Sequence, residues 1–190
     1  MTLSLGGTAA PEISTSARLK QYRADRPDLG LEELLFQYGR YLMISSSREG
    51  GLPANLQGKW NDKNDPPWRC DYHTDVNVEM NYWMADVANL GECFQPYAAW
   101  IQSIRAVRTE ATKKAFNGAR GWAIRGESGL FGGSTWSWVP GCSAWLLQNS
   151  YDHYRFTMDK AYLREFAYPA MKEVSEFWLD RLKPLPDGTL

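Results

Sequence analysis

The stretch of sequence that decides the fold runs from residue 73 to residue 83 and reads HTDVNVEMNYW. If its first six residues are extended, their side chains alternate between two faces, and His73, Asp75 and Asn77 share one of them. That face offers an imidazole, a carboxylate and an amide, while the residues between them suit a buried core. The helix-like run that follows would anchor this segment. We therefore expect a rigid wall that can hold a polar ligand.

Tryptophan is abundant in this chain, with nine in 190 residues beside ten Tyr and seven Phe. Flat aromatic faces stack on the apolar faces of sugar rings, and the indole adds one hydrogen-bond donor. For any single tryptophan the alternative is that it fills the core. As a group, the tryptophans in Gly- and Pro-rich segments predict a binding cleft: Trp60, Trp68, Trp122, Trp136 and Trp138.

Composition and charge exclude several classes of protein. Hydrophobic residues make up 44% of the chain, charged residues make up 23%, and the net charge is −1. Acids and bases are interspersed, so no clustered basic surface for nucleic acid is expected. No run approaches the length of apolar residues that a membrane span needs. Residues 1–16 lack the features of a signal peptide, and localisation stays open, a periplasmic or secreted parent included.

Cysteine predicts neither a zinc site nor a disulfide framework. Cys70, Cys93 and Cys142 are odd in number and lack a CxxC spacing, so we expect three plain thiols. The HxDxN pattern at residues 73–77 offers metal-ligand types, but no second cluster of ligands supports it. We predict no metal and no cofactor.

The pattern along the chain is helical, with two long loops and no strand pattern of any length. Asp28 is expected to cap the first helix, Asp159 the last, and Pro169 interrupts that last helix. The loops, residues 47–75 and 117–141, are of a length that is usually functional in a compact domain. The predicted helices cover residues 30–45, 77–90, 92–116, 143–156 and 160–181.

The predicted elements divide the chain into two parts. Residues 1–28 are dominated by Gly, Ser, Thr and Pro before a charged patch, and we expect a flexible segment there. Residues 29–190 are expected to form one helical domain. Its succession of helix, loop, helix pair, loop and helix pair suits an α/α toroid or a helical bundle.

Four motifs of the sequence stand out together: LPANLQGKWND at 52–62, PPW at 66–68, DYHTDVNVEMNYW at 71–83 and GARGW at 118–122. With these motifs, from about residue 30 to residue 190, the sequence resembles glycoside hydrolase family 95, whose members are chiefly 1,2-α-L-fucosidases. The resemblance implies an (α/α)6 barrel, of which this chain would supply about half. We therefore expect an all-α toroid fragment, with the remainder of a longer parent as its missing partner.

The same resemblance implies a chemistry. Family members invert configuration at the anomeric carbon with a water held by an amide pair at the positions of Asp75 and Asn77, and His73 matches a sugar-contacting position. Their general acid is a Glu that lies shortly beyond the position matching Leu190. Asp75 replaces the usual Asn, and a carboxylate can accept a proton whereas an amide cannot. The parent is expected to release terminal α-L-fucose or α-L-galactose from oligosaccharides, and the isolated chain to be inactive.

Further sugar contacts are expected from the two loops. Trp60 and Trp68 belong to the first loop, and Trp136 belongs to the second. Glu127 lies in a Gly-rich run of the second loop and is the best carboxylate of the chain for contact with a ligand.

Several of these residues have a structural alternative. Asp75 can cap the helix that follows it, and His73 can be a half-buried structural histidine. Glu79 is expected to cap that helix or to pair with a core Arg. Bracing or other structural roles are expected for Asn55, Gln57, Asn81 and His153.

Two alternatives concern the whole chain. The first is a non-catalytic carbohydrate-binding helical module, suggested by the Trp-rich loops. The second is a bare helical scaffold, which predicts that the loop tryptophans are buried and that residues 47–75 form no concave site. Half a toroid also leaves apolar helix faces unpaired, so the isolated chain is expected to self-associate or to melt easily.

Overall fold

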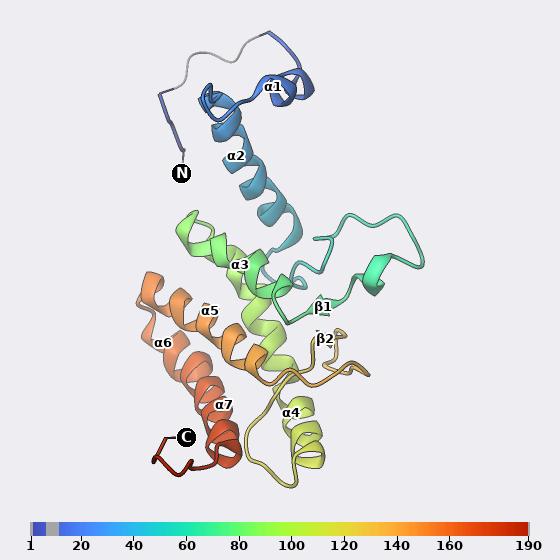
Figure 1. The fold of residues 1–190 in the computed structure, drawn as a ribbon, viewed down its shortest axis with the longest axis vertical. Helices are drawn as coiled ribbons and strands as arrows, with labels where there is room; N and C mark the ends of the chain where they lie inside the picture. The colour runs from blue at the N-terminus through green and yellow to red at the C-terminus, as the bar shows by residue number, and fades with distance from the viewer. Residues whose placement is uncertain (1, 7–11, 190) are drawn as a thin grey trace.

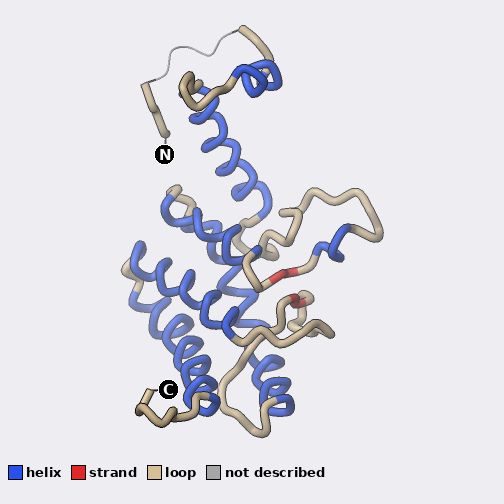
Figure 2. Tube along the Cα trace, in the orientation of Figure 1, coloured by secondary structure: helices blue, strands red, loops and turns tan. Residues whose placement is uncertain are grey.

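The computed structural model describes residues 2–6 and 12–189 and is mostly helical, which confirms the predicted all-α class (Figure 2). Besides the helices it contains two short 3-10 turns, a π-helical turn and two two-residue strands. In chain order the elements are α1 (Thr15–Gln21), α2 (Leu29–Ser46), η1 (Pro67–Cys70), β1 (Tyr72–His73), α3 (Asn77–Val87), η2 (Gly91–Phe94), α4 (Gln95–Ala115), β2 (Glu127–Ser128), α5 (Gly141–Thr157), α6 (Lys160–Tyr162), η3 (Leu163–Ala167) and α7 (Tyr168–Arg181).

The five predicted helices are present with small changes at their ends. Asp28 caps α2 by accepting a hydrogen bond from Leu31 N at 3.0 Å. Asp159 caps α6 through Ala161 N at 2.8 Å. The last predicted helix is interrupted as expected, because Pro169 lies at the start of α7, directly after the π-helical turn η3.

Three features differ from the sequence expectations. α1 lies in the segment for which no regular element was expected, although residues 7–11 of that segment fall outside the described part of the chain. β1 and β2 are strands where no strand pattern is visible, and two residues are too short to produce a period. The expected extended run over residues 73–78 is wrong, because the chain turns at residues 74–76 and α3 begins at Asn77.

The buried core lies between α3, α4, α5 and α7, which form the body of the molecule (Figure 1). At its centre the rings of Tyr82, Phe94 and Tyr97 pack with centroids 4.7 to 6.0 Å apart. The Tyr97 hydroxyl donates a hydrogen bond to Leu146 O at 2.8 Å, so α4 and α5 are joined by a polar contact inside the apolar core. Burial of large aromatic side chains of this kind dominates the stability of such a body.

The first long loop is fixed to the body by one buried hydroxyl. Tyr82 Oη lies 2.6 Å from Ser47 Oγ and accepts a hydrogen bond from Ala54 N at 2.8 Å. Ser47 Oγ donates onward to Cys93 O at 2.8 Å, so the Tyr82 hydroxyl donates to Ser47. Ser47 and Ala54, in the first part of this loop, are therefore held to Tyr82 of α3.

The second long loop needs glycine where it passes α7. Gly121 has a φ of 63°, and a Cβ at this position would lie 1.7 Å from the carbonyl oxygen of Glu173. Only glycine adopts this backbone without strain and also allows the loop to approach the helix so closely. The close approach leaves the neighbouring Trp122 fully buried.

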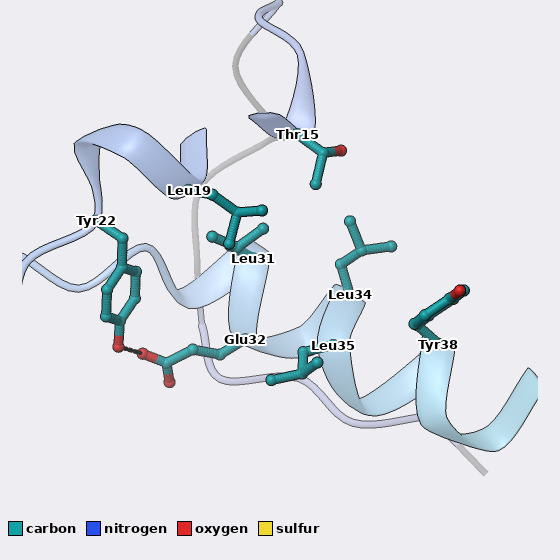
Figure 3. Close-up of a pocket in the computed structure, with 8 residues that line it drawn as sticks. All are labelled: Thr15, Leu19, Tyr22, Leu31, Glu32, Leu34, Leu35 and Tyr38. Atoms are coloured by element: carbon teal, nitrogen blue, oxygen red, sulfur yellow. Dashed lines mark hydrogen bonds between the residues drawn. The ribbon is translucent and has the colours of Figure 1, made fainter. Parts of the chain in front are cut away.

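α1 and the first half of α2 form an arm that stands apart from the body (Figure 1). Arg18 on α1 donates to both carboxylate oxygens of Asp28 at 2.8 and 2.7 Å, which fastens α1 to the start of α2. A cavity of about 680 Å³ lies in this arm (Figure 3). Its lining is apolar apart from the hydroxyls and one carboxylate, Glu32, which already accepts a hydrogen bond from Tyr22.

None of the helices in the described ranges has the length and apolar character needed to cross a membrane.

Candidate functional site

The segment that carries Asp75 and Asn77 is a turn leading into α3. Asp75 is exposed in this turn, and Asn77 is the first residue of α3 and half-buried. The N-cap position of α3 is Val76, and no side chain provides a capping hydrogen bond there. The Asp75 side chain therefore does not cap α3, and the residue lies exposed at the surface.

Backbone pairing joins this segment to the second long loop. In the antiparallel β1–β2 pair His73 lies opposite Glu127. Thr74 extends the contact, because its N–H donates to Gly126 O at 3.0 Å and its hydroxyl donates to Arg125 O at 2.5 Å. Two of the residues predicted to contact sugar, His73 and Glu127, are thus brought side by side, immediately before the turn that carries Asp75.

Asp71 is a member of this cluster that sequence reasoning missed. Its Oδ1 lies 2.9 Å from His73 Nε2, and Glu127 Oε1 lies 3.7 Å from Arg69 Nη1. Burial raises the pKa of Asp71, and the neighbouring Glu127 charge raises it further. The sequence could have indicated Asp71, because residues two apart in an extended segment share a face and Asp71 lies two residues before His73. The sequence does not show that Glu127 joins them, because that contact depends on the pairing of β1 with β2.

The loop tryptophans divide into exposed and buried groups. Trp60, Trp68 and Trp136 are 45%, 68% and 49% exposed, whereas Trp122 is fully buried. Trp68 meets the His73 ring edge-on at 6.0 Å between centroids. The scaffold alternative, which requires all five to be buried, is wrong for these three and right for Trp122, while Trp138 is half-buried.

Residues 47–75 also contribute to a concave surface. A cavity of about 320 Å³ is lined by Trp60, Gln57 and Gly58 of this loop and by residues of α2 and α3. Trp60 packs near Tyr41 of α2, with ring centroids 6.4 Å apart. This second expectation of the scaffold alternative, that the loop forms no concave site, is therefore wrong.

Glu79 lies in the first turn of α3, just after the turn at residues 74–76, and is fully buried. Neither of its carboxylate oxygens has a hydrogen-bond partner among the described residues, so it makes neither the cap nor the Arg pair that was expected. Burial, with a smaller contribution from the nearby charge of Asp75, raises its pKa to about 8. Burial likewise raises the pKa of Cys142 to about 12, with contributions from Glu79 and Asp75. The raised pKa favours the protonated, neutral form of Glu79 near pH 7.

The expected structural roles are confirmed for most of the residues concerned. His153 pairs with Asp86 at 2.9 Å and stacks on Phe94 at 4.5 Å. Asn55 Oδ1 accepts a hydrogen bond from Gln57 N at 2.9 Å, and Asn81 Nδ2 donates to Asn55 O at 3.4 Å. The Gln57 side chain is the exception, because its buried Oε1 has no partner among the described residues. Cys70, Cys93 and Cys142 are free thiols as expected.

The paired loops of the helical body thus bring together carboxylates, an imidazole and exposed tryptophans. Comparison with known proteins defines it further. The family model "Glycosyl hydrolase family 95 catalytic domain" matches residues 1–190, and the chain belongs to this family.

Curated relatives are considerably longer than this chain. It is 37% identical over 202 residues to "Alpha-L-fucosidase 2" of Arabidopsis thaliana, a match that covers 100% of this chain and 24% of that protein. It is 38% identical over 170 residues to "Probable alpha-fucosidase A" of Aspergillus niger, covering 84% of this chain and 21% of that protein. The chain thus spans about a quarter or less of the length of these relatives.

Proposed function

We propose that the protein to which this chain belongs hydrolyses terminal α-L-fucosides, or the related α-L-galactosides, with inversion at the anomeric carbon. The observation that carries the proposal is the β1–β2 pairing, which gathers His73 and Glu127 beside the turn that presents Asp75. Family membership and the names of the curated relatives support the same substrate class.

In this proposal the chain supplies the group that activates water. The Asp75 carboxylate accepts a proton from the water as it attacks, and the Asn77 amide orients that water by hydrogen bonding. His73 and Glu127 hold sugar hydroxyls, while Trp60, Trp68 and Trp136 offer flat faces to the sugar rings.

The second requirement of an inverting hydrolase is a general acid on the opposite side of the sugar. The acid and the base stand roughly 6.5–9.5 Å apart, so that a water fits between them. We assign this acid to the part of the protein outside residues 1–190, as the family resemblance implies. The isolated chain is then expected to be inactive.

The test is made in the full-length parent with a 1,2-α-L-fucoside as substrate. Asp75→Ala is expected to lower turnover by about 10²–10⁴-fold, the usual contribution of a general base. Asp75→Asn restores the amide of the family pattern and separates proton transfer from positioning of the water. Normal turnover in Asp75→Ala, with an unchanged circular dichroism spectrum, would contradict the assignment.

The stereochemistry of the product tests the mechanism independently of the residue. Inversion of an α-linkage releases β-L-fucose first, and proton NMR of the early product distinguishes this anomer from α-L-fucose before mutarotation. Early appearance of the α-anomer would rule out inversion while leaving the substrate assignment intact.

A non-catalytic carbohydrate-binding module is the second candidate, favoured by the exposed side chains of Trp60, Trp68 and Trp136. Titration of the isolated chain with fucose, followed by Trp fluorescence, tests it. Trp68→Ala should remove a saturable change, whereas the distant control Trp178→Phe should retain it. No saturable change at millimolar fucose would argue against binding by the isolated chain.

A further inference from the structure

The second long loop covers one face of α4. Ile104, Arg108 and Thr112 recur every four residues along this helix and therefore share that face. Thr112 Oγ1 accepts a hydrogen bond from Ala123 N at 2.8 Å. Gly132 packs so closely that a Cβ at its position would lie 2.9 Å from the Cβ of Ile104. Arg108 lies between these two contacts along the helix and is only 4% exposed.

The guanidinium of Arg108 has no anionic partner in the part of the chain that the structure describes. Its Nε and Nη1 are buried and donate no hydrogen bond there. None of the ion pairs among the described residues includes Arg108. Burial, with a smaller contribution from the charge of Arg125, lowers the pKa of Arg108. A buried charge without a partner is unfavourable, so this position calls for a compensating anion.

A second arginine adds a like charge at the same place. Arg125 and Trp138 face each other across an antiparallel bridge within the second loop. Arg125 Cζ lies 4.5 Å from the centroid of the Trp138 ring, and Arg108 Cζ lies 5.7 Å from the centroid of the same ring. The indole attracts both cations, but it leaves their mutual repulsion in place. Arg125 donates to the carbonyl oxygen of Trp136 and makes no ion pair with a described residue.

Other arginines of this chain show how a guanidinium is usually compensated. Arg18, which is 6% exposed, donates from Nε and Nη2 to the two carboxylate oxygens of Asp28. Arg105 lies three residues before Arg108 on α4 and donates from the same two atoms to the carboxylate of Glu173 on α7. A carboxylate fits the fork of a guanidinium in this bidentate way. Arg108 is as buried as Arg18 but lacks such a partner.

We propose that Arg108 and Arg125 bind one carboxylate group, and that this group belongs to an acidic side chain of the parent protein outside residues 1–190. The chain covers only 24% and 21% of the two curated relatives, so most of a protein of that length lies outside it. An acidic side chain from that part would complete the pairing that Arg18 and Arg105 find within the chain. The proposal does not rest on the proposed function, because it is tested by unfolding without any sugar.

The substitution Arg108→Met tests the proposal, because it removes the charge and keeps much of the apolar stem. In the full-length parent it should lower the midpoint of thermal unfolding, since it leaves the partner carboxylate buried and unpaired. In the isolated chain it should leave the midpoint unchanged or raise it, since it removes a charge that has no partner. Differential scanning calorimetry measures both midpoints.

Arg105→Met is the matched control on the same helix. Its partner Glu173 lies within the chain, so this variant should lower the midpoint in the parent and in the isolated chain alike. If Arg108→Met leaves the midpoint of the parent unchanged or raises it while Arg105→Met lowers it, Trp138 alone compensates the cation. The proposal would then be wrong.

Acetate is the probe that separates a free carboxylate from a side chain of the parent. Compared with sodium chloride at equal ionic strength, sodium acetate should raise the unfolding midpoint of the isolated chain, and Arg108→Met should abolish this rise. The parent should not respond, because its own carboxylate occupies the position. An equal rise in the parent would mean that the ligand is a free anion, which overturns the assignment to a side chain.

Cross-linking in the parent identifies the partner directly. The amine introduced by Arg108→Lys should form an amide with the neighbouring carboxylate when a water-soluble carbodiimide activates that group. Mass spectrometry of the digested protein should then show the peptide that carries position 108 joined to an acidic residue outside residues 1–190. A cross-link to an acidic residue within residues 1–190 would contradict the proposal.

Discussion

The body and the α1–α2 arm carry the same kind of helical pattern but bury it to different extents. In the body, Phe94 is 1% exposed and touches Tyr82, Tyr97 and His153. In the arm, Leu35 is 70% exposed and Tyr38 is 54% exposed, although both belong to the apolar stripe of α2. An amphipathic pattern therefore states which face a helix can bury, and not whether another element covers it.

The largest difference between the two regions should appear when a large apolar side chain is removed from each. Phe94→Ala is expected to lower the free energy of unfolding by about 3–5 kcal/mol, because it leaves a cavity among packed rings. Leu35→Ala, the matched change in the arm, should alter it by about 0.5 kcal/mol or less. Urea unfolding followed by circular dichroism measures both. Equal losses would mean that the exposed stripe of α2 is covered in solution.

A second test uses the buried acid of the body. The folded-state pKa of Glu79, about 8, lies above its ordinary value of 4.5, so the folded chain binds more protons than the unfolded chain between these values. Stability should therefore fall as the pH rises from about 4.5 through about 8, by on the order of a few kcal/mol. Thermal unfolding from pH 4 to pH 9 measures the effect.

Glu79→Gln is the control for that pH dependence, because it keeps the shape and removes the charge. The difference in stability between the variant and the original chain should grow with pH and favour the variant at pH 9. A constant difference across this range would mean that Glu79 does not titrate in the folded body.

The smallest effect on the stability of the whole chain is expected in the arm, where the pKa of Asp28 is lowered rather than raised. Its hydrogen bonds with Arg18 lower the pKa of Asp28 to about 2, from an ordinary value of 3.8. The contribution of Asp28 to the stability of the arm is thus present above about pH 4 and is lost as the pH falls through about 2. Hydrogen exchange should show α1 and the start of α2 losing protection in this window before the body does.

Asp28→Ala should cause the same loss of hydrogen-exchange protection in α1 and the start of α2 at neutral pH, because it removes both the cap of α2 and the pairing with Arg18. Asp25→Ala, three residues away and exposed, is the control and should change nothing. Equal protection of the arm in both variants would show that other contacts hold α1 in place.

Much of the helical fold was predictable, because helix formation depends on nearby residues. The caps at Asp28 and Asp159 and the interruption at Pro169 follow from side chains and ring geometry that act within one turn. The candidate site was predictable only in part. His73 and Glu127 could each be chosen by chemical type, but their contact depends on a two-residue pairing between distant loops, which leaves no periodic signal.

The sequence by itself determined the family, the helical class and the residue types of the site, since motif spacing and hydrophobic periodicity are local properties of the chain. The tertiary structure alone decided that Asp71 lies beside His73 and Glu127, that Glu79 is fully buried, and that the apolar stripe of α2 is exposed to solvent. The physical reason is that burial and electrostatic environment are set by neighbours from other parts of the chain, and a linear pattern does not specify those neighbours.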